Sequence, residues 1–381
     1  MQFTKIVITG GPCAGKTTGL SYVERELTKI GYKVIFLNET ATEIILSGAD
    51  NTAFTNNEDF ETQIIKLQLE KEKFYEKMCK TLPNEKVILI CDRGVMDCKA
   101  YTTDEEFSTI LNKLSLEEIQ LRDNYDAVFH LVTAAKGAEE FYTKANNAAR
   151  RENLEEARLA DDKTMQCWMG HPHFRAIDNS TNFENKMKRL VKEICVCLGE
   201  PKPLEIERKF LIEKPDVEIL TSIPNCSRVD IIQTYLISDQ NEEKRVRQRG
   251  LDGSYIYTLT TKTHISDIKR IETEERITQR EYLTLLNDAD TNVHQIRKTR
   301  YCIMHNNKYF EIDIYPFSLN TAICEIELAS EDETFEMPEY VKVIKEVTDD
   351  KRFSNYAFSK QIPEEMLNST LLTKASIRKL K

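Results

Sequence analysis

The chain has 381 residues and a formal net charge of −10 at pH 7, which argues against a general nucleic-acid-binding protein because such proteins present a basic face. Its length exceeds what one core usually holds, so the sequence predicts two domains. Ten cysteines lack a regular framework, the N-terminus enters a predicted strand directly, and no apolar run could span a bilayer, so we expect a cytoplasmic protein.

Residues 1–199 alternate short apolar strands with longer helical stretches, which indicates an α/β domain with a parallel sheet. The predicted strands are Lys5–Thr9, Lys33–Leu37, Lys86–Cys91 and Ala127–Val132, and the predicted helices are Gly15–Ile30, Asn57–Leu82, Leu116–Asn124 and Phe183–Leu198. A glycine and two prolines at 199–203 then interrupt the chain, so we expect residues 200–203 to be a linker.

The first predicted strand runs into a sequence with the spacing Gly-x-x-x-x-Gly-Lys-Thr, which is typical of a phosphate-binding loop (P-loop). The glycines let backbone N–H groups turn inward as an anion nest, and the next helix points its N-terminus at the phosphates. Lys16 is expected to reach the terminal phosphates in catalysis, and the Thr17 hydroxyl to bind Mg²⁺. The predicted nucleotide-binding residues of the loop are Gly10, Gly11, Pro12, Cys13, Ala14, Gly15, Lys16, Thr17 and Thr18.

A P-loop also needs an acidic group for Mg²⁺ or for the attacking nucleophile. Asp92 ends a predicted buried strand, where ligands of parallel sheets gather, so it is the candidate for both metal binding and catalysis. The alternative is an aspartate that caps the next segment. Glu39 follows another predicted strand and could bind Mg²⁺, water or a substrate hydroxyl.

Two further segments carry candidate residues. Arg150 and Arg151 precede a helical run and would place positive charge on a transferred phosphate if they belong to a lid; otherwise they form a solvated basic turn. Asp178 and Asn179 are expected to bind the base or to cap a helix. His171 and His173 flank a proline without other soft ligands, which argues against a metal site there.

These motifs resemble those of the AAA-type P-loop domain related to nicotinamide riboside kinases and deoxynucleoside kinases. The resemblance rests on residues 10–18, 39–43, 92–94 with Asp97 and Tyr101, 149–152 and 178–181. It implies Mg²⁺-dependent binding of a nucleoside triphosphate. Whether the phosphate passes to water or to a small acceptor stays open.

After the linker the hydrophobic period changes to 2, so residues 204–362 are predicted to form a mainly antiparallel β domain. Two helices are expected within it, near Gln279–Ala289 and Glu339–Thr348. Residues 363–381 form a basic tail, which could be a solvated amphipathic helix or a peripheral membrane anchor.

Charged residues recur at alternate positions along these strands, so each row lies on one face of its strand. The rows are Glu205, Glu207 and Lys209; Arg245, Arg247 and Arg249; Glu272 and Glu274; Lys298 and Arg300; Glu311 and Asp313; and Glu325 and Glu327, joined by Lys262. An ordinary sheet with one solvated face would explain the alternation. Because the rows are segregated by sign, we favour a sheet closed around a polar tunnel, which suits a polyphosphate bridged by Mg²⁺ or Mn²⁺.

This half resembles the CYTH superfamily of triphosphate tunnel enzymes, whose opening Glu-x-Glu-x-Lys motif is matched at 205–209. Further matches span residues 233–236, 245–247, 260–262, 311–313, 325–327 and 350–356. The resemblance implies that the metal ligands are Glu205, Glu207, Glu325 and Glu327. It also implies that the phosphates are bound by Lys209, Arg245, Arg247, Lys262, Lys298 and Arg300.

The order of the two domains resembles the TRPL translocation defect proteins of eukaryotes, described as binding GTP and phosphoinositides. That resemblance implies a GTP-binding or ATP-binding protein, a slow NTPase, whose tunnel binds a phosphoinositide headgroup or a triphosphate, with peripheral membrane contact during trafficking. The alternative is a bifunctional enzyme with a small-molecule kinase domain and a metal-dependent triphosphatase tunnel. A third alternative makes the P-loop a purely structural nucleotide site.

Overall fold

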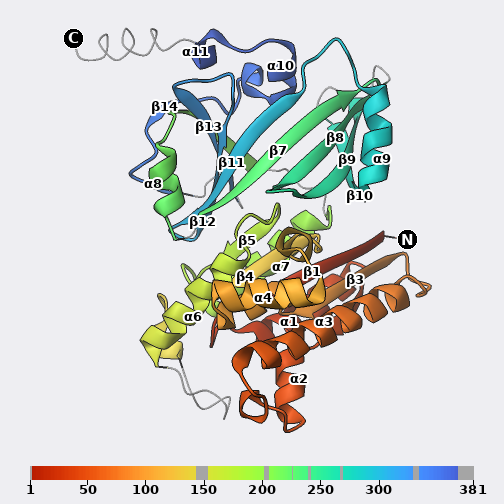
Figure 1. Ribbon diagram of the computed structural model, residues 1–381, viewed down its shortest axis with the longest axis vertical. Coiled ribbons are helices and arrows are strands. Elements are labelled where there is room, and N and C mark those ends of the chain that lie inside the picture. The colour runs from red at the N-terminus through yellow and green to blue at the C-terminus, as the bar shows by residue number, and fades with distance from the viewer. Residues whose placement is uncertain are drawn as a thin grey trace. The chain divides into compact units, whose positions relative to one another are not determined.

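The computed structural model describes residues 2–142, 153–200, 206–224, 226–238, 242–266, 269–328 and 334–367, with side chains omitted at 206, 263–266 and 269–273. The chain divides into two compact units, Met1–Glu205 and Ile206–Lys381. Figure 1 shows an α/β unit and a mainly β unit, each of which is described by itself below. The predicted fold class, a parallel-sheet P-loop domain followed by an antiparallel β domain, is confirmed.

The first unit contains a five-stranded parallel sheet in the order β2-β3-β1-β4-β5. Its strands are β1 (Gln2–Gly10), β2 (Lys33–Leu37), β3 (Lys86–Asp92), β4 (Ala127–Leu131) and β5 (Phe174–Ile177). The α-helices are α1 (Lys16–Lys29), α2 (Thr40–Leu46), α3 (Asn57–Cys79), α4 (Asp104–Leu114), α5 (Glu118–Arg122), α6 (Leu154–Cys167) and α7 (Phe183–Cys197). Short 3₁₀ helices are η1 (Asn51–Ala53), η2 (Val95–Tyr101) and η3 (Glu139–Phe141).

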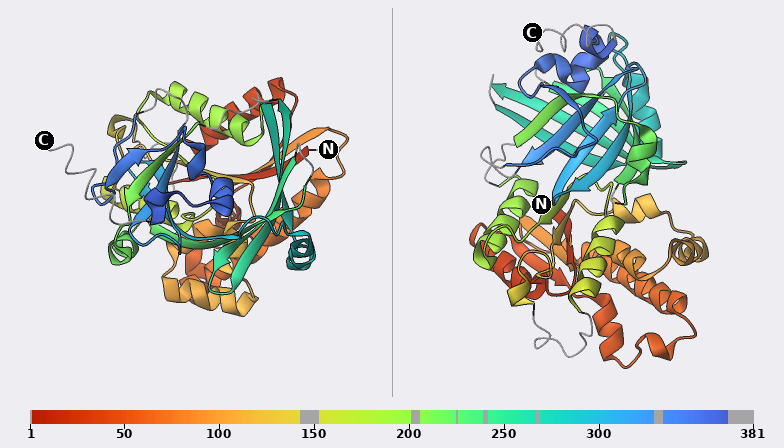
Figure 2. Two further views of the ribbon diagram at one scale, coloured as in Figure 1. Left: turned by 90° about the horizontal axis from the view of Figure 1, so that it is seen from above. Right: turned by 90° about the vertical axis from the view of Figure 1, so that its left-hand side faces the viewer.

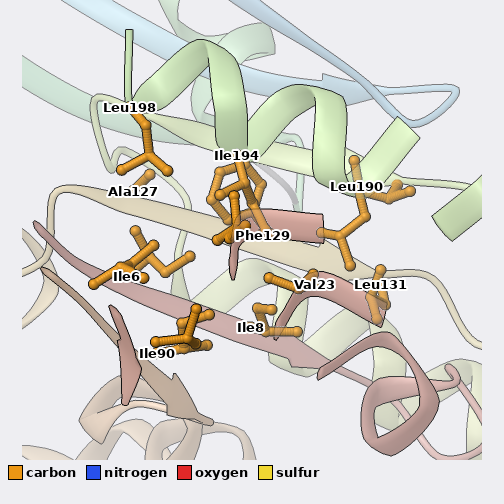
Figure 3. Close-up of a cluster of buried hydrophobic side chains, with 14 of the residues drawn as sticks. Ile6, Ile8, Val23, Ile90, Ala127, Phe129, Leu131, Leu190, Ile194 and Leu198 are labelled. Carbon is orange, nitrogen blue, oxygen red and sulfur yellow. The ribbon is translucent and has the colours of Figure 1, made fainter. Parts of the chain in front are cut away.

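Helices cover both faces of this parallel sheet, which explains why its strands are nearly continuous apolar runs. On one face Ile6 and Ile8 of β1 pack with Val23 of α1 and with Leu190 and Ile194 of α7 (Figure 3). The side chain of Lys5 lies on the opposite face and contacts α3. Each large aliphatic side chain buried in this way contributes about 1.5–3 kcal/mol of burial free energy.

The second unit contains a nine-stranded antiparallel sheet in the order β10-β9-β8-β7-β11-β12-β13-β6-β14, which is curved (Figure 2). Its strands are β6 (Ile206–Glu213), β7 (Cys226–Leu236), β8 (Glu242–Leu251), β9 (Ser254–Ser266), β10 (Lys269–Ile277), β11 (Ile296–His305), β12 (Lys308–Ile314), β13 (Thr321–Leu328) and β14 (Val343–Glu346). Its helices are α8 (Val217–Ser222), α9 (Gln279–Leu285), α10 (Asn355–Lys360) and α11 (Glu364–Leu367), with the 3₁₀ helices η4 (Leu286–Asp288) and η5 (Lys351–Phe353). Within the described residues the ladder is not closed by pairing of β10 with β14.

One of the two helix predictions for this unit is wrong. Residues 343–346 form the edge strand β14, which pairs antiparallel with β6, whereas a helix was expected over Glu339–Thr348. Val341, Val343 and Val347 occur in this segment, and β-branched side chains favour a pleated strand. The other predicted helix is present as α9 followed by η4.

The basic residues of the predicted tail, from Lys374 onward, lie outside the described part of the chain, of which α11 is the last element. Among the helices that the structure describes, none has both the length and the apolar composition needed to cross a bilayer.

Candidate functional site

The P-loop connects the end of β1 to the start of α1 through two positions where only glycine fits. Gly10 has φ of 147°, and a Cβ atom there would lie 2.2 Å from the carbonyl oxygen of Leu131. Gly15 has φ of 88°, and its Cβ would lie 2.6 Å from the Phe183 ring. The glycine spacing of the motif therefore follows from backbone conformation and close packing.

The N-terminus of α1 offers free hydrogen-bond donors. No side chain caps this helix. Within the described part of the chain, the backbone amides of Gly15, Lys16 and Thr17 donate no hydrogen bond to another residue. Unpaired amides at a helix N-terminus, together with the helix dipole, favour an anion. These unused donors suit an anion, the kind of ligand that the sequence predicts for this loop.

Lys16 lies within a cluster of charged side chains from the ends of β2 and β3. Burial and the nearby Arg93 lower the pKa of Lys16, while Glu39 and Asp92 oppose that effect. The Arg93 Nε donates to Glu39 at 2.6 Å, and its Nη1 lies 3.4 Å from Asp97. The structure thus brings together three residues predicted from separate motifs, and it adds Arg93 and Asp97 as their supports.

Asp92 differs from Glu39 in having an unused acceptor. Its Oδ1 is buried and has no hydrogen-bond partner among the described residues, and burial raises the pKa of this carboxyl group. Burial also acts on Glu39, but Arg93 and Lys16 lower its pKa overall. A buried acceptor without a donor is costly unless a ligand completes it. Asp92 therefore suits a Mg²⁺ ion, and the hydroxyl of Thr17 is exposed beside the loop.

Asp178 and Asn179 are held in hydrogen bonds that fix the turn after β5. Arg189 Nη1 donates to Asp178 at 2.7 Å. The side-chain amide of Asn179 donates to the carbonyl oxygens of Thr133 and Lys136, both at 2.8 Å. These contacts fix the turn, whereas the N-cap of α7 is Asn182, so Asp178 and Asn179 do not have the predicted capping role.

The described part of the chain does not include three predicted site residues, Arg150, Arg151 and Glu205. Sequence reasoning also missed Asp161 and Lys186, which both contact the P-loop. Neither belongs to a recognisable motif, because each is one of several charged residues in its helix.

His171 is neutral and fully buried. Its Nδ1 accepts the backbone N–H of His173 at 3.1 Å, and its Nε2 lies 3.0 Å from the carbonyl oxygen of Tyr125, so the ring proton is on Nε2. Both ring nitrogens are therefore used within the chain.

We predict that His171 makes the first unit less stable in acid. Burial lowers the pKa of His171 to about 3, partly opposed by Asp123 and reinforced by His173 and Arg122. The unfolded chain takes up a proton near pH ~6.5 that the folded chain does not, so the contribution is complete above that pH. It declines as pH falls towards 3, by at most about 1.4 kcal/mol per pH unit.

The measurement is urea unfolding at about pH 7.5 and about pH 4.5, followed by the fluorescence of Trp168. The free-energy difference between wild type and His171→Gln should shrink at the lower pH. His173→Gln, which changes an exposed ring, should leave the pH dependence intact. A difference between wild type and His171→Gln that is constant with pH would contradict the prediction.

In the second unit, strand register places the predicted rows on one face of the sheet. Glu325 pairs with Lys209 on one side and Glu311 on the other, and Arg300 pairs with Asp313. Paired residues of antiparallel strands share a face. We call this side of the sheet the charged face; it carries Glu207, Lys209, Gln233, Arg245, Arg247, Arg249, Thr260, Lys262, Glu274, Lys298, Arg300, Glu311, Asp313, Glu325 and Glu327.

Arg300 is at the centre of the charged face. Its Nη2 lies 2.6 Å from Asp313 Oδ2 and 2.7 Å from Glu325 Oε2, and its Nη1 pairs with Glu311. Lys209 adds a second cation, 2.9 Å from Glu325 Oε1. Although burial raises the pKa of Glu325, Lys209 and Arg300 lower it overall. Glu325 is therefore ionised, and Glu311, Asp313 and Glu325 are all already paired with cations.

The arginine row of β8 lies apart from this cluster. Arg247 Nη1 is 3.6 Å from Glu274, while its buried Nε has no hydrogen-bond partner among the described residues. Burial and the adjacent Arg245 lower the pKa of Arg247. The buried Nε of Arg247, with the second guanidinium group of Arg245 beside it, makes this the part of the charged face that best suits phosphate oxygens.

Glu207 and Glu327 form the carboxylate pair predicted to bind metal. They are direct partners between β6 and β13, and both side chains are exposed. Desolvation and the nearby Glu325 raise the pKa of Glu207. Within the described ranges no group of three His, Cys, Asp or Glu side chains is placed to hold a metal ion. Of the other two expected ligands, Glu325 is paired with Lys209 and Arg300, and Glu205 lies outside the described residues.

Apolar side chains cover one end of the charged face. Leu211 and Ile323 occupy positions in line with the charged rows, and they pack with Phe353, Phe358 and Met366 in one buried cluster. The last three belong to η5, α10 and α11. Of these, α10 and α11 lie together at one end of the sheet in Figure 1. The opposite face of the sheet packs a separate core against α8.

Comparisons with known proteins give a family-model match and a sequence relative. The family model of the AAA domain matches residues 5–186, which include the P-loop. An inorganic triphosphatase of Nitrosomonas europaea is 33% identical over 165 residues, which are 42% of this chain and 99% of that protein. The chain thus has a region similar to the AAA domain and a part similar to that inorganic triphosphatase, to whose family it belongs.

Two solved structures are also similar, one of an inorganic triphosphatase and one described as a hypothetical protein. Each is 30% identical, covers 42% of this chain and has a TM-score of 0.31. The match covers 97% of the chain in the inorganic triphosphatase structure and 100% of the chain in the structure of the hypothetical protein.

Proposed function

We propose that this chain is a bifunctional phosphate-handling enzyme, in which the first unit binds a nucleoside triphosphate and the second hydrolyses a triphosphate. The observation that supports it most is the charged face, where the arginine row of β8 and the carboxylates of β6 and β13 occupy different strands of one surface. Kinship with an inorganic triphosphatase over nearly all of that protein's length favours this function over the alternatives.

The second unit has the charges that such a reaction needs. Arg245 and Arg247 would bind the phosphate oxygens directly, with Lys209, Lys262, Lys298 and Arg300 as further cations, and Glu207 and Glu327 would bind a divalent metal together with Glu205 and Glu325. A triphosphate carries about four negative charges, so carboxylates can approach it only through a cation. A bound Mg²⁺ or Mn²⁺ would supply Lewis acidity and an activated water.

In the first unit Lys16 and the open amides of the P-loop would hold the β- and γ-phosphates, while Asp92 and Thr17 would bind Mg²⁺. Glu39 lies beside them and would orient a water or an acceptor hydroxyl. The base could be guanine or adenine, and the resemblance to GTP- and phosphoinositide-binding proteins makes GTP and a phosphoinositide headgroup ligands that the experiment must include.

The test is phosphate release by the purified full-length chain from tripolyphosphate, GTP and ATP, with Mg²⁺ or Mn²⁺, and in the presence of soluble inositol phosphates. We expect tripolyphosphate hydrolysis, reduced at least ~10-fold by Glu327→Gln because a metal ligand is lost. The matched control is Glu346→Gln, which removes a glutamate paired with Arg208 on the opposite side of the sheet.

Two outcomes would change the proposal. If wild type binds tripolyphosphate or an inositol phosphate without hydrolysing either, the second unit is a binding module. If Glu327→Gln and Glu346→Gln are equally active, the charged face is not where the reaction occurs.

A further inference from the structure

The backbone of the P-loop is held by one buried anionic side chain and one buried cationic side chain, which come from different helices. Asp161 belongs to α6 and Lys186 to α7, and their side chains are 0% and 2% exposed. We propose that these two are positioning residues for the phosphate-binding loop, and that they set its affinity for a nucleoside triphosphate by holding its backbone in the binding conformation. This inference rests on the proposed nucleotide binding of the first unit.

Asp161 fixes the start of the loop. Its Oδ1 accepts the backbone N–H of Gly11 at 2.9 Å and that of Thr133 at 3.1 Å, and it lies 3.0 Å from His130 Nε2. Its Oδ2 pairs with Lys136 at 2.9 Å. Burial raises the pKa of Asp161, but His130 and Lys136 lower it overall, so the carboxylate is ionised. A buried carboxylate is stable only with such a set of donors.

The contact with Asp161 is too close for a side chain at position 11 of the loop. A Cβ atom at Gly11 would lie 2.7 Å from both the Cβ and the Oδ1 of Asp161. The glycine at position 11, which the Gly-x-x-x-x-Gly-Lys-Thr spacing leaves variable, is therefore explained by the close contact with Asp161 of α6.

Lys186 fixes the other end of the loop. Its Nζ donates to the carbonyl oxygens of Ala14 at 3.3 Å and Val132 at 2.7 Å, and to Asn179 Oδ1 at 2.7 Å. An ammonium group has three N–H donors, and each has an acceptor here. The contact with Asn179 also gives this residue a role that needs no contact with a nucleotide base.

The two residues between these anchors are tied to the turn after β4. Thr133 donates its hydroxyl to the carbonyl oxygen of Pro12, and Ala134 donates its N–H to that of Cys13 at 3.3 Å. From Pro12 to Ala14, three successive carbonyl oxygens thus accept bonds from the body of the unit. Carbonyl oxygens would repel a phosphate, so engaging them leaves the loop's amides to face it.

The experiment measures GTP and ATP binding, each with Mg²⁺, to the full chain by isothermal titration well below the unfolding temperature. Asp161→Asn and Lys186→Met should each weaken binding about tenfold, since the loop must then be ordered at the expense of binding free energy. The matched controls change a neighbour that does not contact the loop. One control is Asp162→Asn, because Asp162 also pairs with Lys136 but its side chain is half exposed. The other is Lys188→Met, which removes an exposed ion pair with Glu184.

The stoichiometry of binding separates positioning from a loss of folding. A variant that is partly unfolded binds fewer nucleotides per chain with unchanged affinity, whereas a loosened loop binds one per chain with weaker affinity. Unchanged affinity in both Asp161→Asn and Lys186→Met, or loss that appears only in stoichiometry, would overturn the proposal. If wild type itself binds neither nucleotide, the proposed function of this unit fails instead.

Discussion

Replacing Lys16 with alanine is expected to weaken the binding of a nucleoside triphosphate by about 10- to 100-fold, the value of a charged hydrogen bond to phosphate. Lys16 is the cation of the P-loop, and the groups around it, Glu39, Asp92 and Asp97, are acidic. Without its ammonium group an incoming phosphate would meet mainly carboxylates, with Arg93 already paired to Glu39. The effect should therefore exceed that of any other single change in the loop.

Isothermal titration of GTP and of ATP into Lys16→Ala measures this loss. The control is Lys29→Ala at the other end of α1, where the lysine is exposed and pairs with Glu26. Unaltered nucleotide affinity in Lys16→Ala would show that the principal nucleotide site lies elsewhere. Tripolyphosphate hydrolysis should be unaffected by this substitution, because it is assigned to the other unit.

The second large effect is expected at Arg300, whose removal would leave Glu311, Asp313 and Glu325 without their shared cation. Asp313 is 0% exposed, so its charge would be buried next to two other carboxylates with Lys298 as its remaining partner. Breaking a buried ion pair by deleting one member costs about 3–5 kcal/mol. Arg300→Ala should destabilise the second unit by at least that amount.

The two units can be followed separately, because Trp168 of the first unit is the only tryptophan of the chain. In urea, far-UV circular dichroism should show an earlier transition for Arg300→Ala, while the tryptophan fluorescence transition stays in place. Arg208→Ala, which breaks a partly exposed pair with Glu346, should cost only about 0–1 kcal/mol. Equal effects of the two substitutions would contradict the assignment of Arg300 as the centre of a buried network.

The P-loop and the charged face could be predicted because local rules determine them. Gly10 and Gly15 are required by positive φ angles next to packed neighbours, and a period of exactly two residues carries a whole row to one side of a strand. The network around Arg300 could not be predicted. The partners of Arg300 come from β12 and β13, and the order of these strands in the sheet cannot be derived from their sequences.

Asp161 and Lys186 were missed for a related reason. On a helix a single charged residue has the same local pattern whether it faces water or a distant loop, and here each meets residues more than a hundred positions away. The strand β5 was also missed, since it is four residues long and contains Arg175. The error at β14 arose because an edge strand rich in lysine and glutamate also suits a helix.

The pairing of charges on the charged face affects how a ligand would arrive. Cations and carboxylates are present there in similar number, and most lie within ion-pair distance of each other, so their fields cancel a few ångströms away. The surface would therefore exert little long-range attraction on a polyanion, and a chain of net charge −10 would add a weak repulsion. Selectivity would arise on contact, when the ion pairs within the charged face are replaced. Phosphate oxygens would then bind the arginines, and an accompanying metal would bind the carboxylates.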